Sequence, residues 1–239
     1  MEKTRSKINY QKKMEDILAK ESEKGRIPKL LLHSCCAPCS TYVLEYLSPH
    51  FDIGVLYYNP NIHPSEEYYK REAEQKRFID LVNKVNKIEL IQAKYNPQEY
   101  FDAVKGFEND KEGGLRCGLC FDLRLNEAAK YAKEHGYDYF TTTLSISPHK
   151  NADLINHLGE LLENKYDVSY LYADFKKKNG FKRSIELCNQ YDVYRQNYCG
   201  CVFSLKESQE RMKNMELKSE DQLDKELKED LKGIHTNNN

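Results

Sequence analysis

The 239-residue chain contains no tryptophan, no apolar run near the ~20 residues that cross a bilayer, and no excess of charge of one sign. Lys and Arg total 37 against 38 for Asp and Glu, so the formal net charge is −1. A broad basic footprint for nucleic acid is therefore missing. The polar start of the chain also lacks the apolar core of a signal peptide. We expect a soluble, cytoplasmic protein that acts away from membranes.

Two phosphate-binding patterns are absent as well. Neither Gly-x-x-x-x-Gly-Lys-Ser/Thr nor Gly-x-Gly-x-x-Gly follows an expected strand. The place after the first strand is instead taken by cysteines. The chain has eight cysteines, well below the ~8–10% of residues that marks a disulfide scaffold. Because no export signal is found, clustered cysteines indicate metal binding or redox chemistry rather than structural disulfides.

The middle of the chain alternates between strand-like and helix-like segments. Strands are expected at 29–33, 51–58, 87–93, 137–144 and 168–173. Helices are expected at 40–47, 65–85 (capped by Ser65), 98–104, 119–135, 151–165 and 184–190. This alternation predicts an α/β fold with a mostly parallel sheet and helices on both faces. We expect an N-terminal helical extension over 1–28, a catalytic domain over 29–204, and a charged helical or disordered tail over 205–239.

Three clusters hold seven of the eight cysteines. The first is His33-Ser-Cys35-Cys36-Ala-Pro-Cys39, at an expected strand-to-helix turn. A helix amino end stabilises thiolates there and lowers their pKa. Adjacent Cys35 and Cys36 are strained as a disulfide pair, but both can face a polynuclear metal cluster. All the clusters lie where a strand or loop meets a helix, which is consistent with one shared site at the carboxyl ends of the strands.

The other two clusters are Cys117-Gly-Leu-Cys120 and Cys199-Gly-Cys201. The first spacing serves zinc ribbons, thiol–disulfide exchange and iron–sulfur ligation alike. The second can bind one metal or form a strained, easily reduced disulfide. Seven thiols exceed the four of a structural zinc site, so soft all-sulfur ligation favours an iron–sulfur cluster, with two zinc sites as the open alternative. Cys188 stands alone and is expected to be a core residue.

Two further segments are rich in polar side chains. Tyr58-Asn59-Pro-Asn61-Ile-His-Pro64 ends one strand, either as a site or as an Asx-turn before a helix. The run Thr141 to Lys150 ends another strand, where its hydroxyls can cap a helix or hold a phosphate. Several of the 18 tyrosines could stack on bases, although most are expected to be packing residues.

Five motifs in fixed order resemble the cobalamin-independent epoxyqueuosine reductases of the QueH type, over about residues 29–204. They are His33-x-Cys-Cys-Ala-Pro-Cys39, Tyr58-Asn-Pro-Asn-Ile62, Arg116-Cys-x-x-Cys120 with Arg124-Leu125, Thr142-Thr-Leu-Ser145 with Ser147-Pro-x-Lys150, and Tyr194-Arg-Gln-x-Tyr-Cys-Gly-Cys201. The material before and after this stretch departs from the family pattern.

The resemblance implies a Rossmann-like fold akin to the adenine-nucleotide-hydrolase (HUP-like) group. It implies removal of the epoxide oxygen from epoxyqueuosine in the anticodon of tRNA, at the wobble position, as the last step of queuosine biosynthesis. An electron-donor protein or other reductant would be the second partner. By the same resemblance, Cys35, Cys36, Cys117 and Cys120 would hold a [4Fe–4S] cluster, an additional iron ion would lie beside it, and Cys199 and Cys201 would form a redox-active pair.

Other roles follow from the positions of residues in these motifs. Asp122 and Tyr198 adjoin cysteine motifs and are candidate proton donors, although Asp122 could instead ligate the additional iron. Cys39 is either a ligand of that iron or a structural thiol. The expected substrate-binding residues are Asn59, Asn61, Arg124, Thr142, Ser145, Lys150 and Arg195. A basic run, comprising Lys176, Lys177, Lys178, Lys182 and Arg183, is expected to touch tRNA phosphates.

Two rival functions remain open at this point. One is a metal-free thiol–disulfide oxidoreductase that uses the C-x-x-C and C-x-C pairs. The other is a zinc-stabilised module that binds RNA without catalysis. Bound iron with broad visible absorption separates the iron–sulfur enzyme from both.

Overall fold

The structure, a computed structural model, describes residues 8–82 and 84–216. The chain divides into two compact units, Met1–Arg195 and Gln196–Asn239. The parts of the expected extensions at 1–7 and 217–239 lie outside the described residues. The expected boundaries at 28/29 and 204/205 stay predictions. No helix within the described ranges is long and apolar enough to cross a bilayer.

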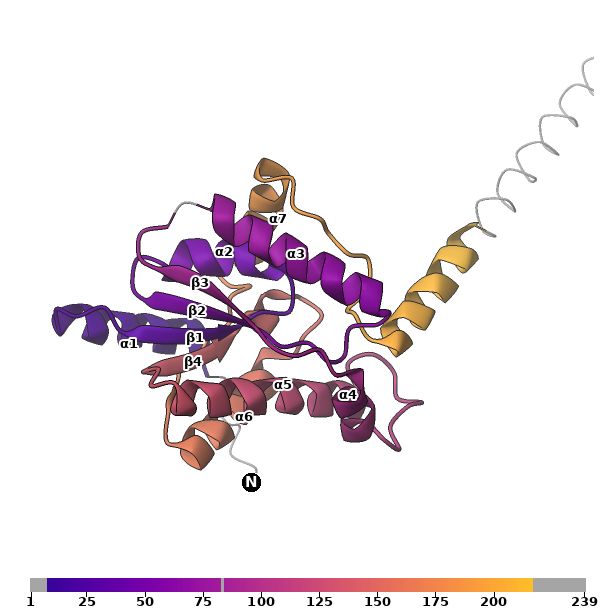
Figure 1. Cartoon of the computed structure of the whole chain (residues 1–239), viewed down its shortest axis with the longest axis horizontal. Coiled ribbons are helices and arrows are strands. Elements are labelled where there is room, and N and C mark those ends of the chain that lie inside the picture. Colours follow the sequence, from indigo (N-terminus) through magenta and orange to yellow (C-terminus); the bar gives the residue numbers. More distant parts are fainter. Residues whose placement is uncertain (1–7, 83, 217–239) are drawn as a thin grey trace, which may run out of the picture. The chain divides into compact units, whose positions relative to one another are not determined.

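A five-stranded sheet forms the centre of the first unit (Figure 1). Its strands are β1 (Lys29–His33), β2 (Asp52–Tyr57), β3 (Ile88–Gln92), β4 (Tyr139–Thr142) and β5 (Ser169–Tyr170). Their order is β3-β2-β1-β4-β5, and all neighbours are parallel. The expected parallel, Rossmann-like sheet is confirmed. The chain runs from β1 outward to β3, then crosses over to β4, so the order reverses beside β1. Ligands of such sheets bind at this switch point, outside the carboxyl ends of the strands.

Helices cover both faces of the sheet, as expected (Figure 1). On one face lie α2 (Ala37–Leu47), α3 (Ser65–Leu81) and α7 (Gly180–Gln190), and on the other lie α5 (Leu115–Glu134) and α6 (Ala152–Tyr166). Successive strand residues point to opposite faces. Leu30 and Leu32 accordingly pack in the core under α2 and α3, whereas Leu31 packs in the core under α5 and α6. α1 (Tyr10–Glu23) adds Met14 and Leu18 to the first core.

Several boundaries differ from expectation, and two of the differences matter for the cysteines. α2 begins at Ala37 rather than at residue 40, with Pro38 in its first turn, where the fixed φ of proline suits a helix start. α5 begins at Leu115 rather than at residue 119. Consequently Cys39 and Cys117 lie within the first turns of their helices rather than before them, and Cys120 lies in the second turn of α5.

The remaining differences lie away from the cysteines. The strand expected over 168–173 pairs only at Ser169–Tyr170, and α7 begins at Gly180 rather than at residue 184. Ser65 does not cap α3, because Pro64 holds the N-cap position and the Ser65 hydroxyl donates to Glu66 instead. In the second unit, a helix runs over 202–216.

Candidate cysteine metal site

The turn after β1 brings three sulfurs together. Cys36 Sγ lies 3.8 Å from Cys35 Sγ and 3.1 Å from Cys39 Sγ. Cys36 occupies the N-cap position of α2 in an extended conformation, so Cys35 and Cys39 reach it from the two sides of the turn. Within the described residues, these cysteines form the only group of three or more potential metal ligands whose ligand atoms lie within 4.8 Å of one another.

Charge at this group concentrates on one sulfur. Hydrogen bonds from the thiols of Cys36 and Cys39 hold the pKa of Cys35 well below its usual value, although burial opposes this. The positive charge of Lys150 and the hydroxyl of Thr143 lower the same pKa further. The adjacent thiolate raises the pKa of Cys36 to about 12 and that of Cys39 well above its usual value. Deprotonation is therefore favoured at Cys35 over Cys36 and Cys39, and the three sulfur donors suit a cation of soft character.

Thr143 supports Cys35 from the other side of the switch point. It begins the short 3₁₀ helix η1 (Thr143–Ile146) directly after β4. Its buried Oγ1 accepts the Cys35 N–H at 3.3 Å and lies 3.5 Å from Cys35 Sγ. Because the oxygen accepts from the backbone, its own proton is available to the sulfur. The sequence placed Thr143 in a hydroxyl run but gave it no role, since only the pairing of β1 with β4 makes the two residues neighbours.

A polar network under the turn fixes the backbone of Cys36. The Ser40 hydroxyl donates to the Cys36 carbonyl at 3.0 Å, and the hydroxyls of Ser34 and Ser40 lie 2.7 and 2.9 Å from Gln75 Oε1. All three side chains are buried. Gln75 comes from α3, and the sequence gave no sign of its part in the site.

His33 is a buried neutral residue that joins β1, β2 and β4. Nε2 must donate to the Tyr58 carbonyl at 3.0 Å, so Nδ1 accepts from the Thr142 hydroxyl at 2.9 Å. Thr142 Oγ1 in turn accepts the Leu144 N–H. Burial lowers the pKa of His33 to about 3, and the charge of Arg124 adds to the effect. The hydroxyl of Thr142, expected to bind substrate, is thus engaged in a structural network.

The second cysteine pair lies on α5. Cys117 packs against the same apolar cluster that contains Cys35, Cys36 and Phe121. Its Sγ accepts the Gly113 N–H at 3.2 Å. Cys120 is buried one turn further along. Cys117 therefore joins the neighbourhood of the first cluster, but neither α5 cysteine belongs to the tight group that suits a single ion.

The expected substrate-binding residues fall into two groups. Asn59 donates from Nδ2 to the Ser34 carbonyl at 2.8 Å, and the Oδ1 atoms of Asn59 and Asn61 are buried with no hydrogen-bond partner. Arg124 is buried on α5 and donates from Nε to the Cys120 carbonyl at 3.1 Å. Asn59 and Arg124 therefore contact the two cysteine motifs of the first unit.

The others are placed differently. Ser145 is buried and accepts the Phe175 N–H, so its hydroxyl holds the loop after β5. Lys150 acts on Cys35 through its charge. Arg195 is exposed at the end of the first unit.

Asp122, a candidate proton donor, is also exposed, on the side of α5 opposite Cys117 and Cys120. The structure does not bring Asp122 to the thiol group, and its role stays a prediction.

The second unit contains Tyr198, Cys199 and Cys201. Neither cysteine takes part in a disulfide, and Gly200 between them has φ +136°. Cys201 directly precedes the 202–216 helix, and its Sγ accepts the Ser204 N–H at 3.4 Å. A sulfur in this position receives the favourable field of a helix amino end.

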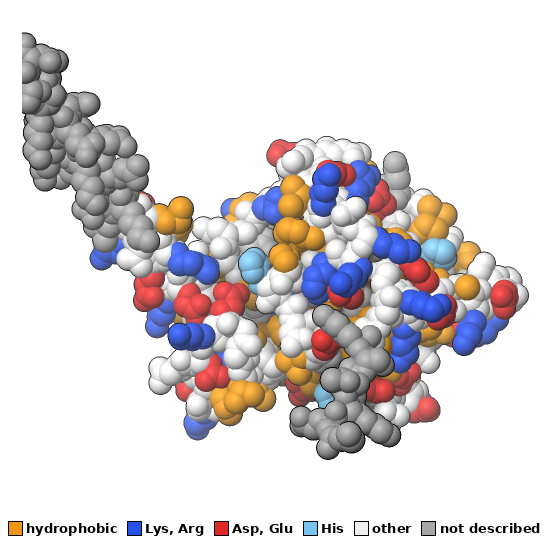
Figure 2. Space-filling model, turned by 180° about the vertical axis from the view of Figure 1, so that it is seen from behind, with side chains coloured by type: hydrophobic (Ala, Val, Ile, Leu, Met, Phe, Trp, Pro, Cys, Tyr) orange, Lys and Arg blue, Asp and Glu red, His pale blue; other side chains and the backbone are white. Residues whose placement is uncertain are grey.

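The expected contact of the basic run with RNA phosphates meets competition from carboxylates. Lys176 pairs with Asp174 at 2.7 Å, Arg183 pairs with Glu45 at 2.7 Å, and Lys178 pairs with Glu15. Cationic and anionic side chains are also interspersed on the face shown in Figure 2. Cys188, in contrast, is buried in the first core, which confirms its expected packing role.

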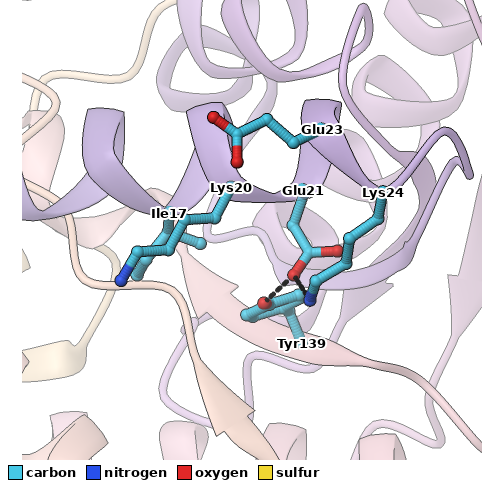
Figure 3. A pocket seen from close by; sticks show the side chains of 6 residues that line it. All are labelled: Ile17, Lys20, Glu21, Glu23, Lys24 and Tyr139. Atoms are coloured by element: carbon cyan, nitrogen blue, oxygen red, sulfur yellow. Dashed lines mark hydrogen bonds and ion pairs between the residues drawn. The ribbon is translucent and has the colours of Figure 1, made fainter.

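A surface pocket lies at the other end of the sheet (Figure 3). α1 lines it with Ile17, Lys20, Glu21 and Glu23, the C-cap residue Lys24 follows them, and Tyr139 lines it from the first position of β4. Glu21 accepts hydrogen bonds from Tyr139 and Lys24 there. Since the cysteines follow the carboxyl end of β1, this pocket is not part of their site.

Fold and site together define a Rossmann-like α/β protein with a cysteine group able to hold metal at its switch point. Comparison with known proteins gives the family. A family model described as "Epoxyqueuosine reductase QueH" matches residues 30–207. A Staphylococcus epidermidis protein of that name is 50% identical to this chain over 83% of this chain and 85% of its own length. A Streptococcus pyogenes protein of that name is 48% identical over 84% of this chain and 79% of its own length. A Thermotoga maritima protein of the same name is 35% identical over 76% of this chain and 93% of its own length. The chain belongs to the epoxyqueuosine reductase QueH family.

Proposed function

We propose that the protein is an oxidoreductase that converts epoxyqueuosine to queuosine at the wobble position of tRNA, the last step of queuosine biosynthesis. The epoxide loses its oxygen as water and becomes an alkene, which consumes two electrons and two protons. Family membership supports this function, and the observation that carries its chemistry is the group of buried thiols at the switch point of the sheet. The catalytic segment is 29–204, and the tRNA substrate makes the cytoplasm the expected compartment.

The donor set of the site fits an iron–sulfur cofactor. We assign Cys35, Cys36, Cys117 and Cys120 to a [4Fe–4S] cluster and Cys39 to an additional iron ion. Three of these cysteines share an apolar cluster with Cys39, no histidine joins the tight group, and all-sulfur ligation suits iron–sulfur chemistry. When bound, the cofactor would supply electrons and a Lewis acid for the epoxide oxygen. The thiolate character of Cys35 favours loading of the metal, because thiolates are the ligating form.

The remaining residues would bind the substrate and move protons and electrons. Cys199 and Cys201 would relay electrons from a donor protein or other reductant by cycling between dithiol and disulfide. Tyr198 or Asp122 would protonate the departing oxygen. The unpartnered carbonyl oxygens of Asn59 and Asn61 are acceptors for substrate hydroxyls. Arg124, Lys150 and Arg195, with the hydroxyls of Thr142 and Ser145, complete the proposed substrate-binding set.

The test is an anaerobic turnover experiment. Iron-loaded protein is mixed with tRNA containing epoxyqueuosine and a chemical reductant, and the digested nucleosides are weighed by mass spectrometry. We expect a product lighter by one oxygen atom. Cys36→Ser and Cys201→Ser should abolish it, whereas Cys188→Ser, in the core, should not. No product from iron-loaded protein would refute the function. Product from metal-free protein would support a thiol–disulfide enzyme, and a colourless zinc protein that binds tRNA without converting it would support the RNA-binding alternative.

A further inference from the structure

Four aromatic side chains form a surface beyond the carboxyl ends of β2 and β3. His63 precedes α3, Tyr69 lies in its second turn, Tyr95 precedes α4 (Pro97–Ala103), and Phe101 lies within it. Tyr69 is 56% exposed and Phe101 36% exposed, and the other two rings are half-buried. Figure 1 shows the start of α3 and α4 at the same end of the first unit. We call these four side chains the aromatic ledge. Exposed rings gathered at one place indicate a contact surface.

Buried rings hold one half of the ledge rigid. Tyr95 stacks on Tyr68 with ring centroids 4.1 Å apart, and Tyr69 meets Tyr95 edge-on at 6.0 Å. Tyr68 is buried. The Tyr95 hydroxyl donates to the Ile62 carbonyl at 2.7 Å. The rings that face solvent are therefore preorganised, which lowers the entropy lost when a ligand stacks on them.

His63 and Phe101 form the other half of the aromatic ledge. Ile62 adjoins His63, whose ring meets Phe101 edge-on at 6.5 Å. Phe101 in turn packs at 5.7 Å against Tyr100, which is buried. The hydrogen bond from Tyr95 to Ile62 thus joins the two pairs of rings into one surface.

A chain of contacts links the aromatic ledge to the cysteine site. Tyr58 belongs to the apolar cluster that contains Cys35 and Cys36, and its hydroxyl donates to Glu99 of α4 at 2.5 Å. Asn59 holds the start of the loop to His63 by its bond to the Ser34 carbonyl, one residue before Cys35. A nucleotide at the cysteines would thus have its neighbours near the rings.

We propose that the aromatic ledge stacks with unpaired bases of the tRNA anticodon loop beside the nucleotide in the cysteine site. This deepens the proposed function and rests on it. Lys70 and Lys94, adjacent in sequence to the two tyrosines of the ledge, are exposed and provide charge for the flanking phosphates. Burial raises the pKa of Tyr95 and Tyr68, and the charges of Glu66 and Glu72 add to this, so both phenols keep their protons. Stacking accepts every base, so this contact needs no particular base beside the target nucleotide.

The test measures affinity for an anticodon stem–loop RNA without the modification, at several salt concentrations. Tyr69→Ala and Phe101→Ala should each weaken binding by roughly 5- to 150-fold, the range for loss of one base–aromatic stack. The salt slope should stay at the wild-type value, because no phosphate contact is removed. Tyr69→Phe keeps the ring and should bind like wild type. Tyr131→Ala is the matched control, since this ring is half-buried near the far end of α5.

Three results decide the matter. If the dissociation constants of both alanine variants lie within twofold of the wild-type value, the proposal that the aromatic ledge stacks with bases is refuted, even if the wild-type protein reduces epoxyqueuosine. Equal weakening by Tyr131→Ala would also overturn it. Normal turnover of saturating tRNA by the ledge variants, with a raised KM, would support it. Failure of the proposed function is separate, because it shows as absent turnover by the wild-type protein. Because Tyr69 is exposed, its replacement should leave the fold intact, and an unchanged Tm of the variant verifies this.

Discussion

Replacement of Thr143 by valine tests the support of Cys35 from across the sheet. Valine keeps the branched shape of threonine and removes one hydroxyl. That hydroxyl accepts the Cys35 N–H at 3.3 Å and lies 3.5 Å from Cys35 Sγ. Thr143 is fully buried, so water does not replace what is lost. The variant thus leaves a buried N–H without an acceptor and a thiolate with one donor fewer.

The magnitude follows from these two losses. A buried donor left without a partner costs about 1–3 kcal/mol. In a chain of this size, 1 kcal/mol corresponds to a change of roughly 2–4 °C in Tm, so the metal-free variant should melt about 2–12 °C lower. Loss of the hydroxyl should also raise the pKa of Cys35 and slow its alkylation at neutral pH, because the thiolate is the reactive form.

Thermal melting of the reduced, metal-free protein and mass spectrometry of Cys35 alkylation measure the two effects. Thr143→Ser separates them, because it loses a methyl group and keeps the hydroxyl. It should therefore alkylate like wild type. A valine variant with an unchanged Tm and an unchanged alkylation rate would refute the inference that Thr143 holds Cys35.

Three further outcomes are expected. Cys36→Ser should lose most of the iron and visible absorption of anaerobically loaded protein, whereas Cys188→Ser should keep both; equal iron in the two would count against the assignment. Gly159→Ala should lower the free energy of unfolding by about 1–3 kcal/mol, because the new Cβ would run into the buried ring of Tyr170; stabilisation, as expected from helix propensity alone, would contradict this. Burial alone would raise the pKa of Glu21, but hydrogen bonds from Lys24 and Tyr139 outweigh burial, so the pKa is lowered in the folded protein. The Glu21 carboxylate therefore stabilises the fold above its unfolded pKa, and this stabilisation is lost as the pH falls through the folded pKa. Urea unfolding below about pH 5 should therefore show a shallower acid loss for Glu21→Gln than for wild type; identical slopes would contradict it.

Much of the fold is predictable from the chain because it depends on local patterns. The apolar run at Lys29–His33 and its counterparts alternate with helical periods, and this dictates parallel strands. The order of motifs predicted the family, which the comparisons confirm. Boundaries were less secure, since α5 begins at Leu115 rather than at residue 119. Asp122 was chosen by its adjacency to Cys120, whereas its exposed side chain lies on the other side of the helix, and its role stays a prediction.

The sequence by itself determined the parallel α/β architecture and the placement of cysteines at strand–helix junctions, since both follow from periodicity and neighbouring residues. Only the tertiary structure decided which distant groups serve the thiols. The strand order puts β4 beside β1, so Thr143 meets Cys35 across 108 positions, and α3 delivers Gln75 under the same turn. Tertiary packing also gave Lys178 and Arg183 of the basic run carboxylate partners, Glu15 on α1 and Glu45 on α2. These contacts depend on how elements pack across the sheet, which residue spacing along the chain does not encode.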